Sequence, residues 1–256
     1  VKSEIKNLGN QTGYIDKESL PTLGTVSRNE NGYPIGYFFG YKAIGVFQTQ
    51  EEIDSYISPA TGKPIQPNAA PGDTKFEDLN GDGVISDDNE DRTMIGKPNP
   101  DWMVGLTVAA DWNGFDLSAF FQGSFGADVF DALRRYELAA VNYTSDALER
   151  WTGPGTSNSM PRIVLGDTPK NFRPSTLLVH DASFLRLRNL QVGYTLPAQL
   201  TRKAYIQRLR FYASFDNLLT ITGYKGMDPE IGSTMGIDKG VYPQARVYTF
   251  GLNLTF

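Results

Sequence analysis

The chain has 256 residues, with 24 Lys and Arg against 29 Asp and Glu, and its net charge is −5. It contains no cysteine and a single histidine, His180, which excludes a disulfide framework, a thiolate nucleophile and a multi-histidine metal site. The mild acidity argues against a nucleic-acid partner. No run approaches the roughly 18 apolar residues of a spanning helix, but the alternating strands of a transmembrane β-barrel need no such run.

The first residues, VKSEIKNLGNQTG, are polar and contain neither an initiator Met nor a signal sequence. We therefore expect the chain to begin inside a longer protein. Further along, the segment YPIGYFFGYKAIGVF between Tyr33 and Phe47 is compatible with one or two strands.

The segment from Asp73 to Asp91 contains eight acidic residues and one Lys, a net charge of −7, so the remainder of the chain carries +2. Its centre has the spacing of an EF-hand calcium loop, with oxygen ligands at the first, third and fifth positions, a Gly at the sixth and a backbone carbonyl at the seventh. The predicted ligands are Asp78, Asn80, Asp82 and the Val84 carbonyl, with Asp87 and Asp91 closing the shell.

The pattern departs from an EF-hand at the twelfth position, where Asn89 replaces the bidentate Glu, and no helix pattern flanks the loop. A solvated acidic turn without metal therefore remains an alternative, because Asn-Gly and Asp-Gly form turns in either case.

The run from Asp101 to Gly123 predicts a β-hairpin. Trp102 to Trp112 alternates apolar and small or polar residues, Asn113-Gly114 supplies a two-residue turn, and the alternation resumes at Phe115. Ten residue steps between the two Trp residues span about 34 Å, or about 24 Å at a tilt of about 45°. This length matches the apolar band of an outer-membrane barrel, in which aromatic residues lie at both interfaces.

Three more strands are predicted near the C-terminus: Phe184–Leu196, Leu209–Phe215, and a last strand ending on Phe256. Arg186 and Arg188 would be unfavourable in lipid, so we expect them at the outer rim or against protein. If the chain ends on the periplasmic side, strand alternation places the turns at Asn113-Gly114 and Pro197 on the inner side. Segments 49–100, 126–181 and 218–245 then lie on the cell exterior.

Catalytic motifs are absent from the sequence, because it has no Gly-x-Ser-x-Gly elbow and only one His. We therefore predict that the protein is not an enzyme. Tyr136, Tyr143 and Trp151 are aromatic residues of the predicted outer loops that could stack on sugar rings, although interface anchoring or packing is the more common role for each. No substrate-binding residue is assigned.

Taken in order, these segments resemble the C-terminal part of the SusC/RagA family of TonB-dependent outer-membrane transporters. The resemblance rests on GYFFGY and GVFQ near the start, PGDTKFEDLNGDGVISDDNEDRTMIGKPNPDW, GFDLSAFFQG, Arg150-Trp151-Thr152, SFLRLRNLQVGYTLP, FYASFDNLLTITGY, MDPE and the terminal GLNLTF.

The resemblance implies an all-β fold: the C-terminal strands of a 22-stranded antiparallel transmembrane barrel with long extracellular loops. Residues 1–256 would form part of the barrel, the plug and the N-terminal barrel strands being absent, with the EF-hand-like turn in an exterior region at 49–100. It also implies TonB-energised import of oligosaccharides or peptides through the outer membrane, together with a SusD-like lipoprotein. A secreted, calcium-stabilised β-sandwich that acts in binding or adhesion is the alternative.

Overall fold

The structure is a computed structural model that describes residues 3–21, 23–87, 90–134, 136, 138, 142–231 and 235–256. Strands dominate it. The strands are β1 (Tyr14–Leu20), β2 (Gly24–Glu30), β3 (Tyr37–Tyr41), β4 (Ala43–Val46), β5 (Thr74–Phe76), β6 (Arg92–Gly96), β7 (Trp102–Trp112), β8 (Phe115–Phe125), β9 (Asp128–Asp131), β10 (Val179–Asp181), β11 (Phe184–Thr195), β12 (Arg208–Thr222), β13 (Ile237–Asp238) and β14 (Val247–Thr255). The helices are α1 (Gln50–Ser55) and α2 (Ala198–Thr201), with the 3₁₀ turns η1 (Ser145–Glu149), η2 (Leu165–Asp167), η3 (Thr176–Leu178) and η4 (Arg202–Ala204).

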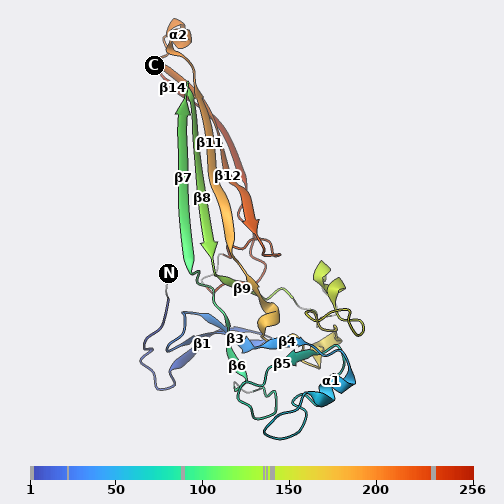
Figure 1. Ribbon diagram of the computed structural model, residues 1–256. Helices are drawn as coiled ribbons and strands as arrows, with labels where there is room; N and C mark the ends of the chain where they lie inside the picture. Colours follow the sequence, from blue (N-terminus) through green and yellow to red (C-terminus); the bar gives the residue numbers. More distant parts are fainter. Residues whose placement is uncertain are drawn as a thin grey trace.

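Five long strands form one antiparallel sheet in the order β14-β12-β11-β8-β7, which projects from the rest of the molecule (Figure 1). These are the five strands that the sequence predicts. In the hairpin, Trp112 pairs with Phe115 across Asn113 and Gly114, whose φ values of 48° and 87° both lie in the left-handed region that the turn requires. The all-β prediction is therefore confirmed.

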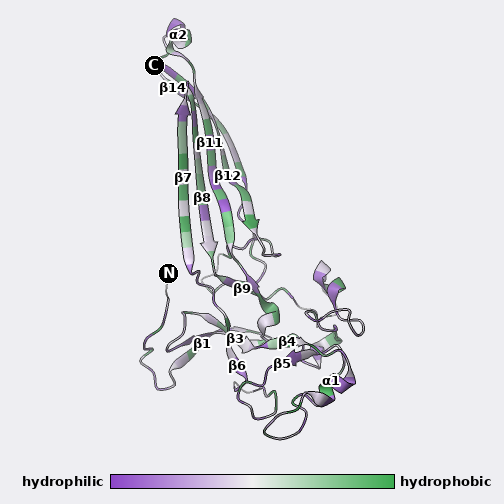
Figure 2. Cartoon of the chain, viewed as in Figure 1, coloured by the Kyte–Doolittle hydropathy of each residue, from purple (hydrophilic) through white to green (hydrophobic). Residues whose placement is uncertain are grey.

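Most apolar positions of the five strands fall on one face of this sheet, whereas Phe120 of β8 and Phe184 of β11 lie on the other. Leu106 pairs with Phe121, Leu117 with Val192, and Phe211 with Leu252, so each cross-strand pair extends the same surface. Figure 2 shows the resulting hydrophobic stretches along β7. Trp102, Trp112 and Phe250 remain 71%, 76% and 75% exposed. In the described part of the chain no second sheet covers this face, so the structure does not support a β-sandwich.

The opposite face of the sheet is polar and is bridged by side chains. Arg210 on β12 forms two hydrogen bonds to the carboxylate of Asp116 on β8, 2.8 and 2.5 Å long, across the intervening strand β11. Gly193 lies between them, and a Cβ there would come within 2.5 Å of Asp116 Oδ1. Because Gly193 has no side chain, the bidentate pair can form.

All long connections gather at one end of the sheet, where β7 begins and β8 ends, whereas α2 and the C-terminus lie at the other end (Figure 1). The long-loop end contains three smaller sheets, β1-β2-β3-β6, β4-β5 and β10-β9-β13. This grouping agrees with the sequence prediction that the alternating direction of the strands places all long connections on the same side. That the long-loop end faces the cell exterior remains a prediction.

A buried cluster joins several segments of the long-loop end. Val26 (β2), Phe38 (β3), Phe130 (β9), Leu178 (η3) and Ile237 (β13) are at most 2% exposed and pack together. Since these residues come from positions as distant as 26 and 237, β9, η3 and β13 pack as one unit with β2 and β3. No helix in the described residues is long and apolar enough to cross a membrane.

Two details differ from the sequence predictions, and the one or two strands expected within Tyr33–Phe47 are present. The end predicted for the strand Leu209–Phe215 was wrong, because β12 continues to Thr222 through a bulge at Asn217, where φ is 53°. Residues 218–222 are therefore strand and not loop. Strands β3 and β4, within Tyr33–Phe47, belong to the small sheets at the long-loop end. Helix α1 was not predicted, although Thr49 and Glu52 have the spacing of a capping box and Glu52 N donates to Thr49 Oγ1.

Candidate functional site

The acidic turn folds on itself through a series of short side-chain to backbone hydrogen bonds. Asp78 accepts from the N–H groups of Gly81 (2.8 Å) and Gly83 (2.9 Å), Asn80 accepts from Asp82 N, and Asp82 accepts from Val84 N. Gly81 and Gly83 have φ values of 78° and 90°, which only glycine adopts without strain. The turn thus brings the first four predicted metal ligands into one tight loop.

The other two predicted ligands are engaged elsewhere. Asp91 is fully buried, and its two oxygens accept from Leu79 N and Ser86 N, each at 3.1 Å, so it joins the two ends of the turn. Asp87 forms an ion pair with Lys170, and the hydrogen bond from Lys170 lowers the pKa of its carboxyl. No group of three or more His, Asp or Glu side chains in the described residues is arranged to hold a metal ion. The calcium site stays a prediction.

The acidic turn rests on its neighbours. A Cβ at Gly83 would lie 2.7 Å from Ser58 Oγ, so the turn approaches residue 58 closely enough to require glycine. The Tyr41 hydroxyl donates to the Ser86 carbonyl at 2.7 Å. These contacts fix the position of the turn against β3 and the segment that follows α1.

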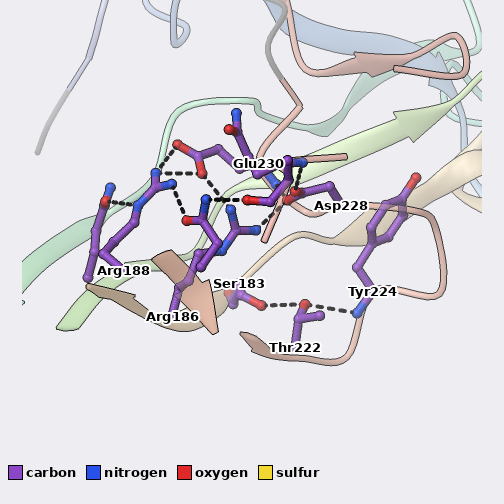
Figure 3. Close-up of polar contacts among 11 residues, drawn as sticks. Ser183, Arg186, Arg188, Thr222, Tyr224, Asp228 and Glu230 are labelled. Atoms are coloured by element: carbon purple, nitrogen blue, oxygen red, sulfur yellow. Dashed lines mark hydrogen bonds and ion pairs between the residues drawn. The ribbon is translucent and has the colours of Figure 1, made fainter. Parts of the chain in front are cut away.

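A network of charged side chains lies on the polar face of the long sheet, near the start of β11 at the long-loop end (Figure 3). Arg186 pairs with Asp228 at 2.5 Å and with Glu230 at 3.1 Å. Arg188 pairs with Glu230 at 2.5 Å and donates to Gln122 of β8. The two arginines therefore pack against protein, which is one of the two locations left open by the sequence.

Arg188 reaches this network because it occupies a bulge. Leu187 pairs with Phe121 of β8, and Asn189 pairs with Phe120, so Arg188 is the extra residue on β11. Arg186 pairs with Gln122 of β8 and Thr220 of β12, which places it on the polar face. The apolar alternation of Leu185 and Leu187 is thus preserved on the other face.

Asp228 is the best-anchored acid of the network. Besides Arg186, it accepts from the backbone N–H groups of Glu230 and Gln244, both at 2.9 Å, and it is only 7% exposed. Burial alone would raise the pKa of its carboxyl, but these backbone donors and Arg186 outweigh burial and lower it. Asp228 therefore fixes the start and the end of segment 228–244 to the sheet.

The three outer-loop aromatic residues have packing roles in the structure. Tyr136 is 1% exposed in a cluster with Ala147, Met160 and Phe172, so its ring is closed to a ligand. Trp151 donates its indole N–H to Gln48 Oε1 at 3.2 Å, and its ring lies directly against Gly72. Tyr143 is 47% exposed, and its hydroxyl donates to the Leu138 carbonyl.

Sequence reasoning missed a buried polar centre beside the acidic turn. Asp73 is 2% exposed, accepts from Arg162 at 2.6 and 3.1 Å, and also accepts from Asn171. Asn171 in turn accepts from Thr74 N. The partners lie about 90 to 100 residues from Asp73, so no local pattern identifies them; the only signal was an acid placed directly after Pro-Gly.

Comparisons with known proteins identify relatives along nearly the whole chain, although no family model matches it. The chain is 34% identical to TonB-dependent receptor P3 of Formosa agariphila over 236 residues, which cover 88% of this chain and 22% of that receptor. It is 30% identical to TonB-dependent receptor SusC of Bacteroides thetaiotaomicron over 248 residues, covering 96% of this chain and 23% of SusC.

The fold agrees with these relatives. A solved structure of the RagAB peptide importer in the 'open-open' state superposes with a TM-score of 0.71 and 26% identity, over 99% of this chain and 25% of that chain. The chain belongs to the SusC/RagA family of TonB-dependent receptors. This confirms the resemblance drawn from its motifs. This SusC/RagA chain spans about a quarter of the length of the relatives it matches.

Proposed function

We propose that the receptor containing this chain imports nutrients across the outer membrane, energised through TonB. The chain would supply five strands of the barrel wall and part of the exterior loops. The observation that supports this most directly is the continuous apolar face of the long sheet, which keeps Trp102 and Trp112, at the two ends of β7, 71% and 76% exposed. Aromatic residues at both ends of an unpacked apolar band are typical of a lipid-facing barrel wall.

The partners follow from the same proposal. A SusD-like surface lipoprotein would sit over the long-loop end, and the TonB complex would act through parts of the receptor outside this chain. Outer-membrane lipid would contact the apolar face. The cargo would be an oligosaccharide or a peptide; RagAB, one structural relative, is named a peptide importer.

We also propose that the acidic turn binds calcium. Asp78, Asn80 and Asp82 use part of their oxygen lone pairs to accept backbone N–H groups, and a carboxylate has about four lone-pair sites, so acceptor capacity remains for a cation. The residues that would hold it are Asp78, Asn80, Asp82 and the Val84 carbonyl. A site of this composition on the cell exterior would need roughly 10⁻⁴ to 10⁻³ M calcium.

The import proposal is tested in cells that lack the full-length receptor and are complemented with its gene. Uptake of fluorescently labelled oligosaccharide and peptide pools is measured with TonB present and with TonB deleted. We expect uptake of one pool that requires both the receptor and TonB, and extraction of the receptor from washed membranes by detergent only. A receptor that leaves washed membranes as a stable monomer in plain buffer would instead be a secreted module.

A further inference from the structure

Two cavities at the long-loop end share a wall made by Lys170 and Arg173. One cavity, of about 680 Å³, lies between segment 61–69, the acidic turn and segment 168–173. The other, of about 520 Å³, lies between Tyr41, Arg92 and segment 166–174. Both cavities are lined by Lys170 and Arg173, so two positively charged side chains lie between them.

Of the three described acids that line these cavities, Asp73 and Asp167 are engaged by other groups, and Asp87 pairs with Lys170 of the shared wall. Asp73 is held by Arg162 and Asn171. Asp167 accepts from the backbone N–H groups of Asn171 and Phe172, at 2.8 and 2.9 Å. Asp87 is therefore the one described acid lining the cavities that offsets the positive charge of the shared wall.

Arg173 is held rigidly and has hydrogen-bonding capacity left. Its guanidinium lies over the rings of Tyr41 and Phe76, 4.7 and 4.9 Å from their centroids, and its Nε donates to the Lys170 carbonyl at 3.2 Å. Its buried Nη1 has no hydrogen-bond partner among the described residues, and Asp87, whose charge acts on Arg173, is itself paired with Lys170. A planar guanidinium fixed in this way is preorganised to bind a carboxylate.

Lys170 lies in a tight turn, with a φ of 59°, and its ammonium group pairs with Asp87. The two side chains of this pair are 52% and 68% exposed. Because exposed ion pairs are weak, a ligand carboxylate can replace that of Asp87. Asp87 thus acts as an internal competitor for the cationic wall.

The larger cavity indicates what kind of molecule would bring the carboxylate. Its apolar surface comes from Pro64, Ile65, Pro67, Ile85 and Pro169, and the amides of Gln66 and Asn68 provide polar groups. None of the described residues that line it is aromatic, whereas sugar rings are commonly recognised by stacking on aromatic rings. Apolar side chains and amide groups suit a peptide better than an oligosaccharide.

We propose that Lys170 and Arg173 bind a side-chain carboxylate of an acidic peptide, whose neighbouring residues occupy the larger cavity. This specifies the cargo class of the import function proposed above and rests on it. The inference concerns binding, so it can be tested separately from transport.

The test uses the full-length receptor purified in detergent and two blocked peptides, N-acetyl-tetra-Glu-amide and its isostere N-acetyl-tetra-Gln-amide. Calorimetry at low salt should show that the Glu peptide binds at least about tenfold more tightly, since charge-assisted hydrogen bonds to carboxylates are strong. Arg173→Gln and Lys170→Gln should each remove most of this preference. Arg202→Gln, which removes an exposed arginine at the opposite end of the sheet, should leave it unchanged.

A variant that binds the Glu peptide more tightly tests the proposal independently, because misfolding could explain a loss of binding but not a gain. Asp87→Asn removes the internal competitor, so it should strengthen binding of the Glu peptide about two- to fivefold. Equal binding of the two peptides by the wild type, or weaker binding by Asp87→Asn, would overturn the inference. Tighter binding of trigalacturonate than of the Glu peptide would overturn the peptide assignment. If TonB-dependent uptake shows no preference for acidic peptides, only the inference about Lys170 and Arg173 is refuted. If the receptor binds the Glu peptide selectively but takes up no cargo, only the import proposal is refuted.

Discussion

Arg186 and Asp228 lie 42 residues apart in the sequence, yet they form an ion pair 2.5 Å long in which both side chains are at most 9% exposed. The pair connects the polar face of β11 to the segment that follows β12. Because Glu230 joins both Arg186 and Arg188, the connection is a network rather than a single contact. Its position makes it the main polar attachment between the long sheet and segment 228–244.

Asp228→Asn should therefore loosen segment 228–244 without unfolding the long sheet. Removing one partner of a buried ion pair leaves an uncompensated charge and costs about 3 kcal/mol. Hydrogen exchange in the full receptor should rise in residues 224–246 and stay unchanged in β7 and β8. The control is Lys225→Gln, because Lys225 is 71% exposed and lies 4.0 Å from Asp146. Equal protection in Asp228→Asn and wild type would contradict the role of the network.

Acidification should weaken the same end of the molecule through His180. Burial lowers the pKa of His180, with Arg134 adding to the effect, and its Nε2 has no hydrogen-bond partner among the described residues. Asp131 and Asp146 oppose the shift, and Lys225 adds to it. Since the folded-state pKa lies below the unfolded value of about 6.5, the folded form loses stability as the pH falls below about 6.5.

The measurement is protease sensitivity of segment 126–181 in the full receptor between pH 7.5 and pH 5. We expect sensitivity to increase on acidification in the wild type and to change less in His180→Gln, which cannot be protonated in this range. An identical pH profile for the two proteins would exclude His180 as the responsible group.

Calcium should protect the acidic turn from proteolysis. Asp78→Ala combined with Asp82→Ala removes two predicted ligands and also three backbone hydrogen bonds, so the turn should become disordered while the long strands remain folded. The metal is distinguished by EDTA, which should sensitise the wild type but have no further effect on the double variant. The control Asp54→Asn changes an acid outside the turn. A wild-type turn that is indifferent to EDTA and to about 1 mM calcium would contradict a metal site.

Two neighbouring residues of β7 test the lipid-facing surface. Leu106 lies on the apolar face and Thr107 on the polar face, near the middle of the strand. Leu106→Arg should lower the free energy of unfolding in lipid vesicles by about 2–4 kcal/mol, because it puts a charge into the bilayer. Thr107→Arg should cost much less. Equal cost at the two positions would contradict the assignment of the faces.

Local patterns were sufficient for the long sheet. Alternation between Trp102 and Trp112, the Asn113-Gly114 turn and the alternation after Phe115 predicted the hairpin and its register. This worked because a strand in a two-faced sheet repeats every two residues, and a two-residue turn fixes which residues pair. The same reasoning ended β12 too early, because the bulge at Asn217 interrupts the alternation before Leu219 and Ile221 resume it.

Local patterns were insufficient for the long-loop end. Strands β1 and β2, with the sequences YIDKESL and GTVSRNE, show little alternation, and their place is decided by pairing with each other and with β3. For Tyr136 and Trp151 the sequence left stacking on sugars, interface anchoring and packing open, and the structure uses both residues in packing. Burial there depends on segments that approach from elsewhere in the chain, so it has no local signature.

The sequence by itself determined the two-faced strands, the tight turn, the acidic segment and the family, because each depends on residues close together in the chain. Only the tertiary structure decided that Arg186 and Arg188 meet Asp228 and Glu230, and that Lys170 and Arg173 separate two cavities. The net charge of −5 illustrates the difference. The sequence shows that the acidic residues are concentrated in residues 73–91. Only the structure shows that Asp73 and Asp87 of this segment pair with Arg162 and Lys170, about 80 to 90 positions away. Electrostatic partners are chosen by distance in space, which only the fold sets.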